Sequence, residues 1–167
     1  MGHVNNVQYI RYAESGRTNW TRNFGRYFDT QHQKQWDEML TSKAVGMILK
    51  SITVDFKFPM TWPDRITVCH KLRSKPDDTT DNMVLDVCIM SERMQRPAAR
   101  CLEDVVVYNY RTGKKSGMPG FMLEQFNNVW ELQESEKAAS TKKVEELLRD
   151  VRELETGTWD REGAVER

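Results

Sequence analysis

The fold is decided by the first stretch of the chain, GHVNNVQYIRYAESGR, which spans residues 2–17. Asn5 is a good N-cap at its polar beginning, because its side-chain oxygen can accept a backbone N–H that the first helical turn leaves unpaired. Apolar residues then recur at spacings of three and four, a pattern that predicts a helix from about Asn5 to Phe24 with one buried face. Gly25 is predicted to end this helix. The free N–H groups and the positive dipole end at its start are suited to hold an anion or a carbonyl oxygen.

The rest of the chain changes its period twice. Residues 31–40 predict a second, short helix, and from residue 44 apolar and polar side chains alternate as they do in half-buried strands. Residues 121–167 return to helical spacing, and the segment from Gly157 onward is expected to fray. Strands are predicted at residues 45–58, 65–73, 82–92 and 98–110.

Strands joined by hairpin-length links form an antiparallel sheet, and a long helix with an apolar face packs across such a sheet. The predicted fold class is therefore α+β, with one long helix across an antiparallel sheet of four strands and a C-terminal helical tail. Residues 1–123 are predicted to form this domain, and residues 124–167 a charged helical extension. A lone helix is marginal in water unless its apolar stripe is buried, so the extension is expected to dock on the domain or on a partner subunit.

Charge content argues against several classes of partner. The 167 residues carry 25 basic and 25 acidic side chains, so no global basic field favours nucleic acid or an anionic membrane. Residues 131–167 hold 11 acidic and 7 basic side chains, a net charge of −4, which leaves +4 on residues 1–130. A mildly basic domain suits an anionic ligand such as a phosphopantetheine carrier, although solvated surface charge explains it equally well. No apolar run approaches the roughly 20 residues of a membrane span, and no signal segment is visible.

Cysteine content and motifs argue against metal or nucleotide chemistry. Cys69, Cys88 and Cys101 lie in strand-like apolar runs without metal-ligand spacing, and are interpreted as buried thiols in a reducing compartment. The sequence also lacks a glycine-rich phosphate loop, a zinc motif and a nucleophile elbow. We therefore expect neither a metal nor a nucleotide cofactor.

The opening stretch also carries a family resemblance. GHVNNVQYIRYAESGR resembles the active-site segment of hotdog-fold thioesterases, the broad group of 4-hydroxybenzoyl-CoA and acyl-carrier-protein (acyl-ACP) thioesterases. Its HVNNVxYI core is especially similar to the acyl-ACP branch, and the whole chain resembles fungal thioesterase-like proteins. The likeness covers about residues 2–123 and implies the hotdog fold, in which a long helix packs across an antiparallel sheet.

One departure from the family concerns the beginning of the chain. The family normally places a strand and an Asp before the glycine that matches Gly2, whereas this sequence starts at Met1. The resemblance therefore implies a hotdog sheet without the first of its usual five strands, and we expect the coding sequence upstream of Met1 to supply a strand ending in an Asp. Residues 1–4 are expected to form a free chain end, which predicts low thioesterase activity and reduced stability.

The resemblance implies roles for individual residues. Backbone N–H groups at the start of the first helix polarise the thioester carbonyl, His3 is a candidate base, and two Asn side chains orient water and thioester. The alternative for each residue is helix capping or loop structure. His32 and His70 are interpreted as non-catalytic. The implied catalytic residues are His3, Asn5 and Asn6, and the implied substrate-binding residues are Gly2, Val4 and Tyr9.

The function that the resemblance implies is hydrolysis of acyl-CoA or acyl-ACP thioesters to free acid and thiol. The alternative is a non-catalytic hotdog protein that binds thioesters or serves as a structural scaffold. Hotdog domains form dimers and unpaired sheet edges are an aggregation hazard, so a homodimer or higher homo-oligomer is expected. The lack of a visible signal favours the cytoplasm, and a presequence upstream of Met1 would direct the chain to the mitochondrion.

Overall fold

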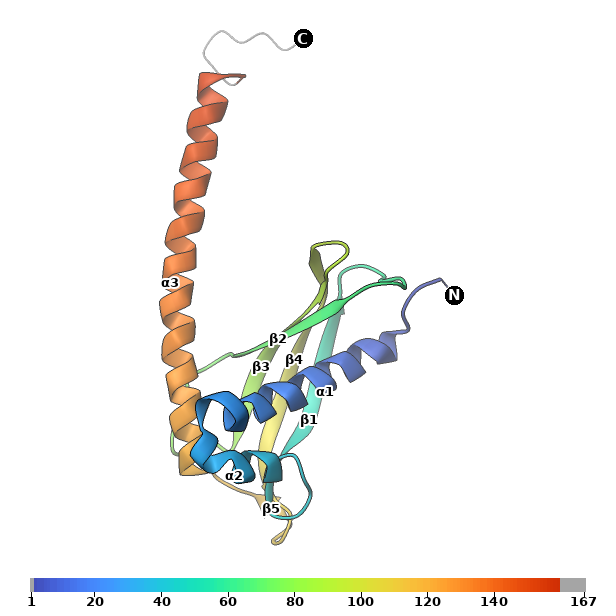
Figure 1. The fold of residues 1–167 in the computed structure, drawn as a ribbon, viewed down its shortest axis with the longest axis vertical. Coiled ribbons are helices and arrows are strands. Elements are labelled where there is room, and N and C mark those ends of the chain that lie inside the picture. Colours follow the sequence, from blue (N-terminus) through green and yellow to red (C-terminus); the bar gives the residue numbers. More distant parts are fainter. Residues whose placement is uncertain (1, 160–167) are drawn as a thin grey trace. The chain divides into compact units, whose positions relative to one another are not determined.

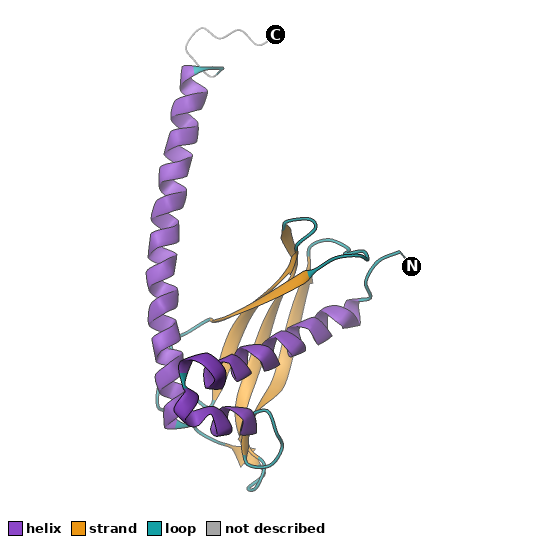
Figure 2. Cartoon of the chain, viewed as in Figure 1, coloured by secondary structure: helices purple, strands orange, loops and turns teal. Residues whose placement is uncertain are grey.

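The computed structural model describes residues 2–159 and places one long helix across one face of an antiparallel sheet (Figure 1). Helix and sheet form two layers (Figure 2). The long helix occupies the predicted position, and the predicted short helix divides into a 3-10 turn and an α-helix. The helical elements before the sheet are α1 (Asn6–Asn23), a π-helical turn (Phe24–Phe28), a 3-10 turn (Thr30–His32) and α2 (Gln33–Glu38).

The sheet contains the four predicted strands and one short addition. Its strands are β1 (Val45–Phe56), β2 (Ile66–Leu72), β3 (Asn82–Ser91), β4 (Arg96–Asn109) and β5 (Lys114–Lys115). The order is β1-β4-β3-β2, every neighbouring pair is antiparallel, and β5 pairs with the end of β4. The predicted α+β class and the antiparallel four-strand arrangement are confirmed. The two residues of β5 are too few for a period-two pattern to reveal them in the sequence.

Buried and less buried side chains alternate along the strands, and the buried ones form the inner face of the sheet, which α1 covers. Along β3 half-buried and buried residues alternate through all ten positions, as expected for a strand with one face against a helix. α1 approaches most tightly at Gly16, where a Cβ atom would lie 2.7 Å from Cγ1 of Val68 and 2.9 Å from Cε1 of His70. A side chain there would overpack the core at a cost of about 1–3 kcal/mol. Gly16 therefore allows helix and sheet to approach this closely.

The end of α1 differs from the prediction. Gly25 does not stop the helix, because the chain continues through it as the π-helical turn. Gly25 is buried, and a Cβ atom there would lie 2.9 Å from Cβ of Trp36. The prediction that Gly25 ends the helix is wrong. Glycine is needed here because it lets Trp36 pack close to the backbone, and not because the backbone is left-handed. Trp36 is fully buried, stacks on Phe24 with ring centroids 4.9 Å apart, and donates its Nε1–H to Asp29.

The C-terminal helix α3 (Gly120–Gly157) is continuous. The chain divides into two compact units, Met1–Trp130 and Glu131–Arg167, and α3 contains the boundary between them. Within the first unit, Met122 and Phe126 are buried in the core.

Beyond residue 130 the predicted helical spacing is confirmed, because α3 extends to Gly157. The large apolar side chains on this part of α3 are each about half exposed or more. Most of the segment predicted to fray, residues 160–167, lies outside the described residues. Within residues 2–159 no helix combines the length and apolar character needed to cross a membrane. The exposed apolar side chains are Leu132, Val144, Leu147, Leu148, Val151 and Leu154.

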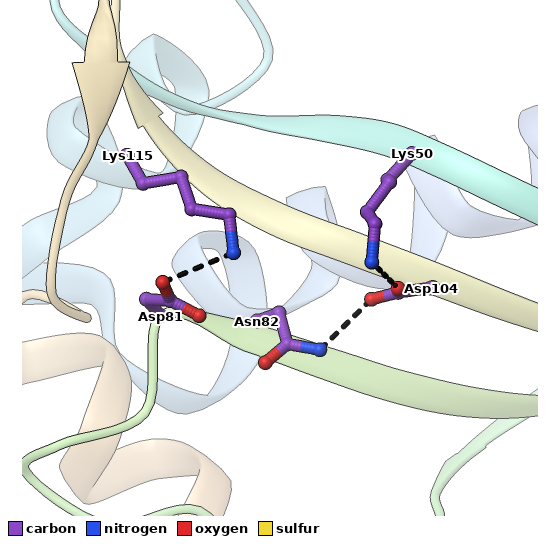
Figure 3. A network of polar contacts seen from close by, with 5 residues as sticks. All are labelled: Lys50, Asp81, Asn82, Asp104 and Lys115. Atoms are coloured by element: carbon purple, nitrogen blue, oxygen red, sulfur yellow. Dashed lines mark hydrogen bonds and ion pairs between the residues drawn. The ribbon is translucent and has the colours of Figure 1, made fainter.

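The outer face of the sheet, opposite α1, carries polar side chains (Figure 3). Asp104 on β4 accepts hydrogen bonds from Lys50 Nζ on β1 at 2.7 Å and from Asn82 Nδ2 on β3 at 2.9 Å. Lys115 on β5 bonds Asp81 at 3.1 Å. The hydrogen bonds from Lys50 and Asn82 hold the pKa of Asp104 below its usual range. Exposed ion pairs are screened by solvent and contribute little net stability, so these contacts keep the face polar more than they stabilise the sheet.

A buried polar cluster lies between α1 and the sheet. Arg17 Nη1 on α1 donates to Oε1 of Glu103 on β4 at 2.5 Å, and Nε2 of His70 on β2 lies 3.6 Å from the other carboxylate oxygen. The side chains of Glu103 and His70 are 0% and 1% exposed. Burial opposes ionisation of Glu103, but His70 and the Arg17 guanidinium outweigh it and hold the pKa of this carboxyl below its usual value of 4.5. The cluster therefore joins α1 to β4 through a buried charge.

Glu103→Gln tests this cluster. The substitution leaves the Arg17 charge buried without its counter-ion, and breaking a buried pair from one side costs about 3–5 kcal/mol in free energy of unfolding. Because the folded pKa of Glu103 is depressed, its stabilisation is complete above the unfolded value of 4.5 and is lost as pH falls through the folded value. Urea unfolding between about pH 7 and pH 3 should show a smaller acid-dependent loss of stability in Glu103→Gln than in the unmodified chain.

Glu14→Gln is the matched control, because Glu14 is an exposed carboxylate on the same helix. It should follow the unmodified chain at every pH. If Glu103→Gln and the unmodified chain lose stability in parallel as pH falls, Glu103 is not the ionised partner of Arg17.

Candidate active site

The start of α1 is capped by Asn5. The backbone of Asn5 is extended (φ −66°, ψ 143°), and its Oδ1 accepts the N–H of Val7 at 2.9 Å. Its carbonyl accepts the N–H of Gln8 at 2.9 Å. The first turn of the helix has the N–H groups of Asn6, Val7 and Gln8, and these two bonds use those of Val7 and Gln8. Among the described residues the N–H of Asn6 has no such partner, as expected at a helix start. The helix thus opens with one backbone donor available to a ligand.

The chain before α1 is tied to the loop after β1. The N–H of Val4 donates to the carbonyl of Met60 at 2.8 Å. The expectation that residues 1–4 form a free chain end is therefore wrong at Val4, and residue 1 lies outside the described residues. Nδ1 of His3 lies 3.1 Å from the carbonyl oxygen of Val4. Since that oxygen can only accept, Nδ1 is the donor in this contact, and in a neutral imidazole with this tautomer Nε2 carries the lone pair that a general base needs.

Tyr9 holds the same loop from the helix side. Its ring is 2% exposed and packs edge-on against Phe56, with centroids 5.2 Å apart. Its hydroxyl donates to the carbonyl of Phe58 at 3.3 Å and accepts the N–H of Met60 at 3.0 Å. Met60 is itself buried, so its N–H depends on Tyr9 for a partner. The position predicted to bind substrate thus also fixes the loop that faces the helix start.

A pocket of about 300 Å³ lies between the start of α1 and this loop. It brings together four of the six residues predicted for the site, whereas Asn5 acts as a cap and Gly2 is exposed outside the lining. Among residues 2–159 no three His, Cys, Asp or Glu side chains lie close enough together to hold a metal ion. The lining residues are His3, Val4, Asn6, Tyr9, Phe56, Lys57, Phe58 and Pro59.

The far wall of the pocket comes from the end of β1 and was not predicted as part of the site. The alternating residues before Pro59 indicate a strand, but the local sequence does not show that this strand will end beside the start of α1. Lys57 is the one cation among the lining side chains and is paired with exposed Asp55. The Arg96 guanidinium lies 4.2 Å from the ring centroid of Phe58 and so stiffens that wall. The pocket therefore combines an apolar wall, the imidazole of His3 and the first residue of α1, Asn6.

Comparison with known proteins identifies the family. The profile of the thioesterase-like superfamily matches residues 1–126, and the chain belongs to this superfamily. No curated protein matches the sequence significantly.

Solved structures that this chain resembles include two thioesterases and a protein solved in complex with CoA. A thioesterase from Thermus thermophilus complexed with coenzyme A and Zn has a TM-score of 0.58 at 17% identity, with 77% of this chain and 81% of that chain covered. A 1,4-dihydroxy-2-naphthoyl-CoA thioesterase from Synechocystis has 0.57 at 16%, covering 75% and 83%. The protein SAV2348 from Staphylococcus aureus, solved with CoA, has 0.59 at 10%, covering 77% and 75%. At these identities the likeness concerns the fold, and the predicted hotdog fold is confirmed.

Tyr9→Phe tests whether the tyrosine hydroxyl fixes the loop. Removal of the hydroxyl leaves the buried N–H of Met60 unpaired, which should cost about 1–3 kcal/mol in free energy of unfolding. Tyr27→Phe is the control, because the Tyr27 ring is 72% exposed. Denaturant midpoints at unchanged m-value give the comparison. Equal midpoints for both variants would show that the Tyr9 hydroxyl contributes nothing to the loop.

Proposed function

We propose that the protein hydrolyses acyl thioesters of CoA or of a carrier protein in the pocket at the start of α1. The observation that carries this proposal is the unoccupied N–H of Asn6, which belongs to a residue lining the pocket. A donor fixed before the reaction, at the positive end of a helix, is what a developing oxyanion requires. The coenzyme A bound to the Thermus thermophilus thioesterase supports CoA as the carrier.

The chemistry follows from the groups that line the pocket. The thioester oxygen accepts the N–H of Asn6, which draws electron density from the carbonyl carbon. Nε2 of His3 takes a proton from water as the water oxygen attacks that carbon. The C–S bond then breaks, the thiolate leaves and is protonated, and the free acid remains. Phe56 and Phe58 give an apolar surface for the acyl group.

The alternative is a protein that binds thioesters without cleaving them. One observation favours it, because no Asp or Glu stands among the described residues that line the pocket. Asp55, two residues before the lining residue Lys57, is engaged by Lys57. Catalysis by an exposed imidazole alone is weaker than catalysis by an imidazole oriented by a carboxylate. The anchored position of Val4 argues the other way, because it holds His3 near the pocket.

Thiol release from a panel of acyl-CoAs, with Asn6 replaced in two ways, tests the proposal. Asn6→Pro removes the N–H, and proline is favoured at the first position of a helix. The extended backbone of Asn5 already suits a residue that precedes proline. Loss of one oxyanion donor should lower kcat/KM by about 10²–10³-fold. Asn6→Ala keeps the N–H and should lose much less, and His3→Ala should lose about 10²-fold.

Asn19→Ala is the matched control, because Asn19 is exposed on the same helix and does not line this pocket. It should keep the unmodified rate. Equal rates for Asn6→Pro and Asn6→Ala would refute the backbone-donor mechanism. Tight acyl-CoA binding without thiol release by the unmodified chain would establish the binding-only alternative.

We also propose a homodimer or higher homo-oligomer. Within the described sheet, β1 and β2 each have one edge without a strand partner. Exposed edges of this length promote association unless another chain or element covers them. Light scattering should give a mass of at least twice the 19.6 kDa of one chain, independent of dilution over a tenfold range. A stable, soluble monomer at every concentration would contradict the proposal.

A further inference from the structure

Two cysteines face each other across neighbouring strands on the outer face of the sheet. In the antiparallel pairing of β2 with β3, Cys69 is directly opposite Cys88. Cys69 is exposed and Cys88 is half-buried, so the prediction of buried thiols is wrong for Cys69. The next residues along these strands, His70 and Val87, have buried side chains on the inner face. Side chains alternate between faces, so both thiols point away from α1.

The pairing brings the two residues within the range of a disulfide. The N–H of Glu92 bonds the carbonyl of Arg65 at 2.9 Å, and the N–H of Arg73 bonds that of Val84 at 3.0 Å. Hydrogen-bonded pairs recur at every second position, so Cys69 and Cys88 also form such a pair, with Cα atoms roughly 5.5 Å apart. A disulfide joins residues whose Cα atoms are about 4.4–6.8 Å apart.

The surroundings give the thiols access to a small anionic reagent. A hollow of about 300 Å³ covers both cysteines, and Lys71 and Arg100 line it. Asp86 also lines it but is paired with Arg73 at 3.5 Å. The two cations therefore attract carboxylates to the thiols.

We propose that Cys69 and Cys88 form a reversible disulfide by exchange with a small-molecule disulfide of the glutathione type. The exposed Cys69 thiolate attacks one sulfur of oxidised glutathione, forming a mixed disulfide and releasing one glutathione thiolate. The Cys88 thiolate then attacks Sγ of Cys69, forming the intramolecular bond and releasing the second glutathione. Each released thiolate takes up a proton equivalent to the one lost by a cysteine. Two cysteine thiols are oxidised and one glutathione disulfide is reduced to two thiols.

Two features make this bond reversible rather than structural. Cβ atoms of directly opposite residues are about 4.5–5.5 Å apart, whereas a disulfide holds them at about 3.5–4.5 Å, so closure strains the strands. Strained and exposed disulfides are the readily reduced ones. β2 can absorb the adjustment because within the described sheet it pairs with β3 alone. Burial raises the pKa of the Cys88 thiol, which makes Cys69 the first nucleophile.

Cys101 supplies an internal control. It is buried on the inner face, and burial raises the pKa of its thiol to about 11. Exchange requires a thiolate and an open approach, so Cys101 should stay reduced under conditions that oxidise the outer pair. It also cannot reach Cys88 through the sheet, because the two side chains are on opposite faces.

The test is peptide mapping of the folded chain after equilibration in oxidised and reduced glutathione mixtures. The expected result is one linked pair of peptides, containing Cys69 and Cys88, which disappears on return to reduced glutathione. Cys101→Ala should give the same link. Cys88→Ser should abolish it and leave a mixed disulfide on Cys69, and Cys69→Ser should abolish it with little reaction at Cys88. A stable glutathione adduct without the link, a link between two chains, or no reaction in the unmodified chain would each overturn the proposal.

Discussion

The close contact between α1 and the sheet at Gly16 is the constraint on which the other features depend. A Cβ atom at this position would overlap Val68 and His70, so only glycine lets the helix axis come this near. The next residue, Arg17, then reaches Glu103 on β4, whose side chain is fully buried, and the ion pair is largely shielded from water. A buried charge pair adds little net stability but penalises any arrangement that separates its partners. Contact and charge together fix where α1 crosses the sheet.

The position of α1 in turn decides what its first turn faces. Tyr9 lies two helical turns before Gly16 and reaches the loop after β1 through its hydroxyl, and Val4 bonds the same loop through its backbone. Between these two attachments a pocket, rather than a packed contact, lies between the start of α1 and the end of β1. The start of a helix is a common site for anions. At the start of α1 the imidazole of His3 and the apolar side chains of Phe56 and Phe58 line the pocket as well.

Sequence periodicity predicted the layers well because each element has its own repeat. The 3.6-residue pattern after Asn5 and the alternation in residues 45–110 give one helix and four strands, as found. Gly25 was misread because a glycine that permits contact looks, in sequence, like a glycine that ends a helix. The sequence motif names two residues that line the candidate pocket, His3 and Asn6, whereas Phe56 and Lys57 join the lining only through tertiary packing. The facing of Cys69 and Cys88 likewise depends on strand register, which no local pattern states.

Ligands of the acyl-CoA type are proposed to bind at the start of α1. An amide NMR titration with a non-hydrolysable thioether analogue of an acyl-CoA locates the binding site, because each backbone N–H reports its own surroundings. The largest chemical-shift changes should fall on the amide of Asn6 and on those of Phe56 to Phe58. Changes centred instead on the separate hollow beside the middle of α1, lined by Tyr12, Ser15 and Asn19, would contradict it.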